Sequence, residues 1–353
     1  MTIQQLIREW PPGYGGVERV AHELGNFWRG EVFSLDVQGQ AHLSSDALPV
    51  AYPRRRLRSI NIFGRLYLPL PSRSLVSLLA SSKPLHGHLP SPGILMLLVL
   101  ARLLRPRRIV MAHWHCFLET APCMNGRLVG FYQWFALRTL PYLFAVVTTS
   151  PALSVELQDF GLSPAQVVVL PCCLGATQEQ SALAVPLPVS EQGEPMRVLF
   201  VGRLDSYKRV DWLLKSLAAL RSPWRLSVVG DGPKRSRFQH LAQQLFFRQL
   251  QEDPELVQFH GRLPESDKQE QIARSDVLVL PSIWPENSPL IVREATRAGL
   301  SVIASAQGPL SPARLNSSKG TSLIFFYNYS NIPNDLHVYL FWVSMSVKWK
   351  RKS

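Results

Sequence analysis

The second half of the chain repeats one pattern, a short apolar run followed by a segment with a helical apolar face. The runs are MRVLFVG (196–202), RLSVVG (225–230), LVQFHG (256–261), DVLVLP (276–281) and LSVIA (300–304). After the first run, apolar residues recur at helical spacing at Val210, Leu213, Leu214, Leu217 and Leu220. Alternation of strands and helices predicts an α/β fold with a parallel sheet covered on both faces.

The first half shows the same alternation less regularly, with strand-like runs at 3–7, 107–113, 143–149 and 165–171. Residues 175–195 lose this periodicity and collect Gln, Pro and Ser, which is typical of a linker. A chain of 353 residues is long enough for two domains. We therefore predict a first domain at 1–175, a linker at 176–195 and a second domain at 196–310.

The tail, residues 311–353, departs from this pattern. It is rich in Ser, Asn and aromatic residues, shows no helical period and ends in a basic cluster. We expect it to add no element to the α/β pattern.

Composition excludes several classes of protein. With 46% hydrophobic residues the chain is not disordered, and four cysteines are too few for a disulfide scaffold. The cysteines have no metal or redox spacing, so we expect buried free thiols. The longest apolar run, Ile94–Ala101, is far below the ~20 residues of a spanning helix, and the first residues do not resemble a signal peptide. These features predict a soluble, cytoplasmic protein.

The formal net charge is +13, and the excess is concentrated. Residues 47–118 hold eleven basic residues and no acidic one. A peripheral contact of residues 54–108 with an anionic membrane surface is one interpretation, and a solvated face is the other. For Arg54–Arg58 both stay open, whereas the apolar run at 94–104 favours a core helix. Zinc-finger, RNP and basic-zipper signatures are missing, so we expect no nucleic-acid partner.

Two segments could bind an anion. Gly15 and Gly16 stand between a strand and a helix, where backbone N–H groups approach phosphates, although such glycines also form ordinary turns. Gly202 ends a strand and is followed by Arg203 and Lys208, two cations suited to a diphosphate at the carboxyl edge of a sheet. The alternative is a pair of surface cations. The turn at 230–233, GDGP, is structural at least as readily as it is a ligand contact.

Acidic residues and a histidine complete the candidate set. Glu286 lies in a loop after a strand, and Glu294 lies about two turns into the helix that begins near Pro289, so both could accept hydrogen bonds from sugar hydroxyls. The alternative is an acid near a helix start and an ordinary surface acid. His113 ends a strand of the first domain, where it could face a ligand or serve only a structural role. His113 and His115 lack further ligands at suitable spacing, so we expect no metal site.

Taken together, these segments resemble glycosyltransferase family 4, a retaining family with the GT-B fold of two Rossmann-like domains. The segments are GYGGVER (13–19), TSPALSVELQDFGL (149–162), VLFVGRLDSYKRVDWLL (198–214), VVGDGP (228–233), FHGRLPESD (259–267) and PSIWPENSPLIVREA (281–295). The last is similar to the E-x7-E motif of that family.

The resemblance implies a role for each candidate. Arg203 and Lys208 would hold and stabilise the departing diphosphate, Glu286 would act near the donor sugar, and His113 near the reacting sugar. The residues implied in donor binding are Gly15, Gly16, Gly202, Asn287, Ser288, Pro289, Leu290 and Glu294. The donor would be a UDP- or GDP-linked sugar and the acceptor a lipid-linked or polysaccharide molecule of the cell envelope. No metal and no cofactor are implied, and the anomeric configuration would be retained.

The sequence departs from the family pattern at two places. Cys172 and Cys173 stand where Asn-Gly is usual, and recognisable similarity ends near residues 307–309. A frameshift or a truncation would produce such a tail. We therefore expect a second domain that is incomplete at its carboxyl end. The alternative function is an inactive relative that binds a nucleotide sugar or a membrane surface without turnover.

Overall fold

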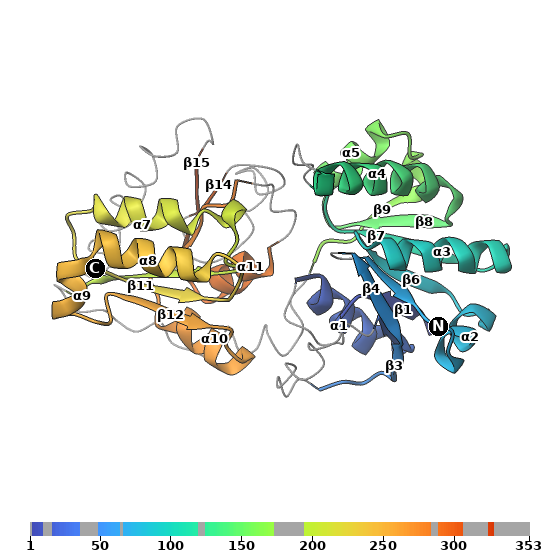
Figure 1. Cartoon of the computed structure of the whole chain (residues 1–353), viewed down its shortest axis with the longest axis horizontal. Helices are drawn as coiled ribbons and strands as arrows, with labels where there is room; N and C mark the ends of the chain where they lie inside the picture. Colours follow the sequence, from blue (N-terminus) through green and yellow to red (C-terminus); the bar gives the residue numbers. More distant parts are fainter. Residues whose placement is uncertain are drawn as a thin grey trace. The chain divides into compact units, whose positions relative to one another are not determined.

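The computed structural model describes residues 2–9, 16–35, 49–63, 66–118, 124–172, 194–283, 289–305 and 324–327. The chain divides into two compact units, Met1–Cys173 and Leu174–Ser353. Each unit is built on one parallel sheet flanked by helices (Figure 1). The predicted α/β class is therefore confirmed. Most of the predicted linker lies outside the described residues.

The first unit holds a seven-stranded sheet in the order β3-β2-β1-β6-β7-β8-β9, with every neighbouring pair parallel. Its strands are β1 Gln4–Ile7, β2 Val32–Leu35, β3 Arg54–Leu57, β6 Leu85–Leu89, β7 Val110–Trp114, β8 Ala145–Thr148 and β9 Val167–Val169. A separate antiparallel hairpin joins β4 Ser59–Phe63 to β5 Leu66–Pro69. The helices are α1 Gly16–Trp28, α2 Arg73–Ala80, α3 Pro92–Leu104, α4 Met124–Thr139 and α5 Pro151–Asp159, with 3-10 turns at Leu140–Tyr142 and Pro164–Gln166.

The two faces of the first sheet differ in chemistry. On one face, α2 to α5 bury a large apolar cluster that includes Phe33, Leu89 and Trp114. Helix α3 supplies most of residues 94–101 to this cluster, so the core interpretation of the run 94–104 is confirmed for that part. It is wrong for Leu103 and Leu104, which are exposed at the end of the helix. On the opposite face lies α1, with a small apolar cluster and an unusual set of buried polar side chains.

The second unit holds a six-stranded parallel sheet in the order β12-β11-β10-β13-β14-β15. The strands are β10 Met196–Val201, β11 Trp224–Val229, β12 Val257–Gly261, β13 Val277–Leu280, β14 Ser301–Ser305 and β15 Ile324–Tyr327. The helices are α7 Val210–Ala218, α8 Arg235–Leu245, α9 Phe247–Glu252, α10 Glu265–Ala273 and α11 Leu290–Arg297, with a 3-10 turn at Ser206–Lys208. Numbered in chain order, the strands run 3-2-1-4-5-6, which is the Rossmann arrangement.

Both faces of the second sheet are apolar, as a buried parallel sheet requires. Helices α7 and α8 cover one face through a cluster that includes Phe200 and Val228. Helices α10 and α11 cover the other through Leu199, Leu278 and Val302. Alternate residues of each strand therefore point to opposite helix layers.

The prediction for the tail is wrong at one segment. Ile324–Tyr327 forms β15 and extends the second sheet by pairing in parallel with β14, with Val302 opposite Ile324 (Figure 1). The sequence IFFY is a short apolar run of the kind that pairs at a sheet edge. None of the described helices is both long enough and apolar enough to cross a bilayer.

Candidate active site

The strand order places a topological switch point between β10 and β13. The chain leaves these neighbouring strands toward opposite sides of the sheet, and open α/β sheets bind ligands outside the carboxyl ends of strands at such a point. The segment after β10 and the segment after β13 meet there, because Ile283 N–H donates to the carbonyl oxygen of Tyr207 at 2.9 Å. Residues predicted from two distant motifs are thereby brought to one edge.

Arg203 and Lys208 lie on the turn that follows β10. The Asp205 carboxylate accepts from Ser206 N–H at 2.8 Å and starts the 3-10 turn that carries Lys208. Its other oxygen lies 3.5 Å from Arg203 Nε. The Arg203 side chain is 48% exposed, so this ion pair leaves its guanidinium accessible. Lys208 lies over the end of β10, since a Cβ placed on Gly202 would be 3.8 Å from Lys208 Cε.

The turn after β11 packs directly against the turn after β10. Gly230 has φ +129°, and a Cβ there would lie 1.9 Å from the carbonyl oxygen of Gly202. At Gly232 a Cβ would lie 2.4 Å from the carbonyl oxygen of Leu204. Both positions require glycine, because any side chain would collide with the neighbouring backbone. The GDGP turn therefore supports the backbone that carries Arg203.

Replacing Gly230 with alanine is expected to destabilise the second unit by about 2 kcal/mol, because the new Cβ adds both an unfavourable φ and a backbone clash. The measurement is the free energy of urea unfolding. Gly202→Ala is the matched control, since its Cβ would meet Phe200 at an ordinary 3.4 Å. Equal stability of the two variants would contradict this account of the turn.

Glu294 lies in α11 and is buried, with only 2% of the residue exposed. Lys268 of α10 reaches it, with 2.7 Å between Lys268 Nζ and Glu294 Oε2, and also pairs with Glu265 at 2.9 Å. The pairing places a cation beside the buried carboxylate. Sequence reasoning missed Lys268 and Glu265, because two charged residues in the first turn of a helix resemble an ordinary exposed helix start.

The structure describes only some of the other residues predicted to bind the donor in the segment before α11. Pro289 precedes α11 and Leu290 is its first residue, both half-buried, which agrees with a helix beginning near Pro289. Glu286, Asn287 and Ser288 lie outside the described residues. Their roles stay predictions.

In the first unit, Gly16 is the first residue of α1, the helix that follows β1 along the chain, and it is exposed, with open space where a Cβ would stand. Gly15 lies outside the described residues. His113 is inside β7 and fully buried, and neither ring nitrogen has a hydrogen-bond partner among the described residues. His115, one residue beyond the strand, stacks on His113 with ring centroids 4.0 Å apart.

Four histidines form a buried cluster on the α1 face of the first sheet. His88 and His113 are paired in register, and His86 and His115 share their face. His88 Nδ1 lies 2.9 Å from His115 Nε2, and its Nε2 lies 2.9 Å from the Gln5 side-chain oxygen. Burial lowers the pKa of all four, to about 3 for His86 and His115, so they are neutral at pH 7.

Within the described ranges, one group of side chains has the donor set of a metal site. Ring nitrogens of His86, His88 and His113 all lie within 4.8 Å of one another. Neutral imidazole is a common metal ligand. His88 already contacts a partner with both nitrogens, so metal binding would displace one of those hydrogen bonds. Sequence reasoning overlooked the second His-x-His pair, His86 and His88, which only the sheet brings beside His113.

The cluster predicts loss of stability in acid. The four histidines have folded-state pKa values below the ordinary 6.5, so below about pH 6.5 the unfolded chain binds protons that the folded chain does not. Stability of the first unit should fall as the pH drops toward 3, by about 1 kcal/mol per pH unit for each histidine. Thermal unfolding between pH 7.5 and 5, with a chelator present, measures the slope.

A single substitution isolates the contribution of one histidine. His86→Leu removes a ring with no described hydrogen-bond partner and should make the pH dependence shallower. His240→Leu, at an exposed position of α8, should leave the slope unchanged. Identical slopes for His86→Leu and the unaltered protein would contradict the prediction.

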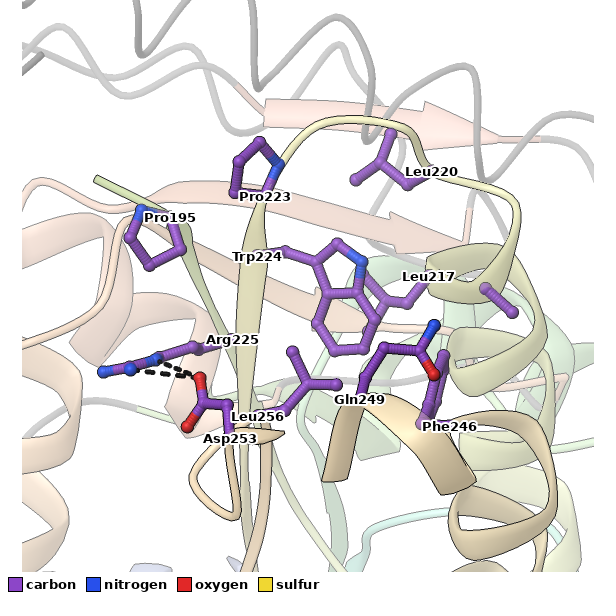
Figure 2. Close-up of a pocket in the computed structure, with 11 residues that line it drawn as sticks. Pro195, Leu217, Leu220, Pro223, Trp224, Arg225, Phe246, Gln249, Asp253 and Leu256 are labelled. Carbon is purple, nitrogen blue, oxygen red and sulfur yellow. Dashed lines mark hydrogen bonds and ion pairs between the residues drawn. The ribbon is translucent and has the colours of Figure 1, made fainter. Parts of the chain in front are cut away.

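A cavity in the described part of the chain lies at the opposite edge of the second sheet. It has a volume of about 310 Å³ and lies at the amino ends of β10, β11 and β12 (Figure 2). Figure 2 shows the indole of Trp224 in its wall, and that ring packs edge-on against Phe246 at 5.0 Å. Because ligands of such sheets bind at the carboxyl ends of strands, this cavity is not the candidate donor site.

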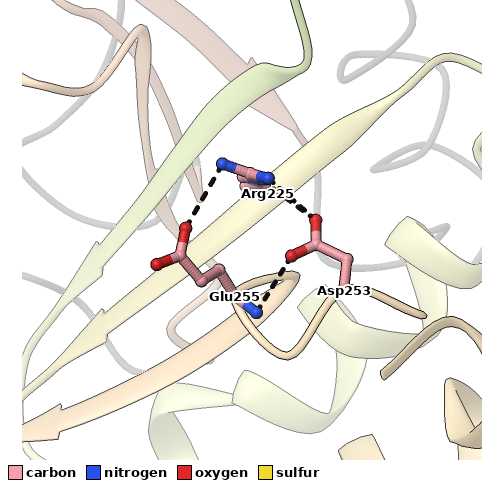
Figure 3. Close-up of polar contacts among 3 residues, drawn as sticks. All are labelled: Arg225, Asp253 and Glu255. Atoms are coloured by element: carbon pink, nitrogen blue, oxygen red, sulfur yellow. Dashed lines mark hydrogen bonds and ion pairs between the residues drawn. The ribbon is translucent and has the colours of Figure 1, made fainter. Parts of the chain in front are cut away.

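A surface charge cluster borders that cavity. Arg225 contacts Asp253 at 3.0 Å and Glu255 at 3.4 Å, and Glu255 N–H donates to Asp253 (Figure 3). The Arg225 side chain is 45% exposed, so these pairs contribute little to stability. Arg225 is thus paired with two carboxylates, whereas the ion pair described for Arg203 is with the single carboxylate of Asp205.

Two family models match the chain, one in each unit and in order. The model described as Glycosyltransferase Family 4 matches residues 14–175, and the model described as Glycosyl transferases group 1 matches residues 188–324. The second match extends beyond residue 310 to the first residue of β15.

Solved structures share the fold at low sequence identity. Anabaena HepE in complex with UDP has a TM-score of 0.67 at 16% identity, covering 99% of this chain and 94% of that one. The lipopolysaccharide outer core galactosyltransferase WaaB has a TM-score of 0.62 at 19% identity, covering 99% and 92%. The chain therefore has the GT-B fold. Fold and family models together support a GT-B glycosyltransferase.

Curated relatives match over shorter segments. Lipopolysaccharide 1,6-galactosyltransferase of Escherichia coli is 31% identical over 121 residues, which cover 33% of this chain and 32% of that protein. An exopolysaccharide phosphotransferase of Streptomyces coelicolor is 34% identical over 105 residues, 29% of this chain and 10% of that protein. The matched segments thus span a third or less of these relatives.

Proposed function

We propose that this protein transfers a sugar from a nucleotide-sugar donor to a lipid-linked or polysaccharide acceptor of the cell envelope. The observation that supports this proposal most strongly is the placement of Arg203 and Lys208. Both lie on one turn at the carboxyl edge of a Rossmann sheet, beside the segment that leads to Glu294. The UDP and UDP-glucose bound to HepE support a uridine nucleotide donor. The galactosyltransferase relative supports an envelope acceptor.

The reaction breaks the bond between the anomeric carbon of the sugar and the diphosphate oxygen. In the proposed mechanism, Arg203 binds two phosphate oxygens with its planar fork and Lys208 adds a point charge. Both cations interact most strongly with the charge that develops on the leaving group, so they lower the barrier. The acceptor hydroxyl bonds to the anomeric carbon, and its proton passes to the departing phosphate oxygen on the same face. Configuration is thereby retained.

Glu294 has a different task in this proposal. Its buried carboxylate would accept hydrogen bonds from the ribose hydroxyls of the donor, as the E-x7-E resemblance implies, with Lys268 holding it in place. Glu286 would act at the sugar itself. Two fixed cations supply the charge stabilisation of the diphosphate, so we propose transfer without a metal ion.

A donor screen followed by a transfer assay tests the proposal. UDP- and GDP-linked sugars are screened for an increase in the thermal unfolding midpoint, because a ligand that binds only the folded state stabilises it. The best donor is then assayed for acceptor-dependent release of nucleoside diphosphate. Stabilisation with release supports the proposal. Stabilisation without release would favour the inactive relative, and a donor screen with no stabilisation would contradict both.

A further inference from the structure

Helix α4 of the first unit has one face fixed in the core. Ala136 and Leu137 belong to the large apolar cluster. The Tyr132 hydroxyl accepts from Ser91 N–H at 2.8 Å, and the Gln133 side-chain oxygen accepts from Leu118 N–H at 2.7 Å. These contacts determine which side of the helix faces outward.

The outward side of α4 is apolar as well. Its exposed positions recur at helical spacing, and we define the aromatic face by them: Arg127, Leu128, Phe131, Trp134, Phe135 and Arg138. Phe131 is 64% exposed, Trp134 53% and Phe135 45%. The outward side of a globular helix is ordinarily polar. Large aromatic side chains at successive turns therefore indicate a partner that covers them.

The aromatic face continues onto neighbouring segments. Tyr142, one turn beyond Arg138, is 75% exposed, and Phe144 is 59% exposed. Arg102 Nε donates to the Tyr142 carbonyl oxygen at 3.2 Å, which places the end of α3 beside this segment. Leu103 and Leu104 at that end are exposed too. The apolar surface thus spans two helix ends and is not a single stray side chain.

The sequence that includes the aromatic face is strongly basic. From residue 47 to residue 155 the sequence has thirteen Lys and Arg residues, and Glu119 is its one acidic residue. Arg138 lies over the Trp134 ring, 5.5 Å from its centroid, and Arg127 stands at the other end of the face. Exposed aromatic rings flanked by arginines match the interface of an anionic bilayer, where rings enter the headgroup region and cations meet lipid phosphates.

We propose that the aromatic face of α4 binds the surface of an anionic lipid bilayer. A second copy of the chain fits this face less well. A symmetric dimer through it would bring the arginines of two copies together, and α4 itself has no acidic residue to offset them. The inference rests on the proposed function in one respect: bilayer binding would bring the first unit to a lipid-linked acceptor.

Flotation of the full-length protein with lipid vesicles tests the proposal. Vesicles are made of phosphatidylcholine alone or of an equal mixture with phosphatidylglycerol. The unaltered protein should float with the mixed vesicles, and the variant Phe131→Ser/Trp134→Ser/Phe135→Ser should bind them at least about tenfold more weakly. Arg127→Gln/Arg138→Gln should weaken binding to mixed vesicles and make its remaining loss with salt shallower, because fewer cations are left to be screened.

Exposed phenylalanines elsewhere supply the matched control. Phe27→Ser in α1 and Phe247→Ser in α9 replace rings that are 81% and 64% exposed and should float like the unaltered protein. Failure of the unaltered protein to bind mixed vesicles, or equal binding by the triple variant, would overturn the proposal. So would a dimer in light scattering that the triple variant loses. Donor-induced thermal stabilisation of the triple variant is measured separately, so loss of vesicle binding and failure of the donor proposal are distinguished.

Discussion

The double substitution Arg203→Ala/Lys208→Ala is expected to reduce the efficiency of sugar transfer by about 1,000-fold or more. Each cation is proposed to contact charge that grows on the departing diphosphate, and removal of one such contact typically costs about 100- to 1,000-fold in rate. Folding should be unaffected, because Arg203 is half-exposed and the 3-10 turn is held by Asp205. Steady-state rates of nucleotide release with saturating acceptor measure the effect.

Two further variants show whether position or charge is responsible. Arg203→Lys keeps the charge but loses the planar fork, so it should recover only part of the activity. Arg248→Ala removes an exposed cation of α9 and should leave the rate unchanged. A double variant at positions 203 and 208 with near-normal turnover would contradict the assignment of these residues to the diphosphate.

The substitution Glu294→Gln is expected to weaken donor binding by about 10- to 100-fold, the usual loss when a charged hydrogen-bond acceptor becomes neutral. Lys268→Met should weaken donor binding too. It should also destabilise the second unit by about 3 kcal/mol, because it leaves the buried Glu294 carboxylate without its nearest cation. Calorimetric titration with the best donor and urea unfolding measure the two effects.

The double variant Glu294→Gln/Lys268→Met separates binding from folding. Replacing both partners of a buried ion pair is far less destabilising than removing one, so stability should return toward normal. Donor binding should stay weak, because the charged acceptor is still missing. Recovery of donor affinity together with stability would show that Glu294 acts only in folding. Lys215→Met, in α7, is the control for loss of a lysine.

The fold of the second unit was predictable because its strands are continuous apolar runs between helical patterns. Strands of the first unit were harder to find. β6 reads LHGHL and β3 reads RRRL, so histidine and arginine obscure the period on which strand prediction depends. β15 was missed for another reason: its four residues stand alone in a segment without neighbouring helices to support the pattern.

The candidate site was predictable where one motif carries its own chemistry. Arg203 and Lys208 follow a strand in one short segment, and the structure brings that segment to the switch point of the sheet. Lys268 could not be identified, because its role depends on the packing of α10 against α11. His113 was expected at a strand end facing a substrate, and its complete burial beside His86 depends on register that a single sequence does not reveal.

The most direct test of the central claim is hydrogen exchange of the full-length protein with and without UDP-glucose. The account predicts slower exchange in the segments 202–208 and 289–294, at the carboxyl edge of the second sheet, and no change around Trp224 in the cavity at its amino edge. Protection confined to the Trp224 cavity, or no protection by any nucleotide sugar that binds, would contradict the donor site proposed at Arg203 and Lys208.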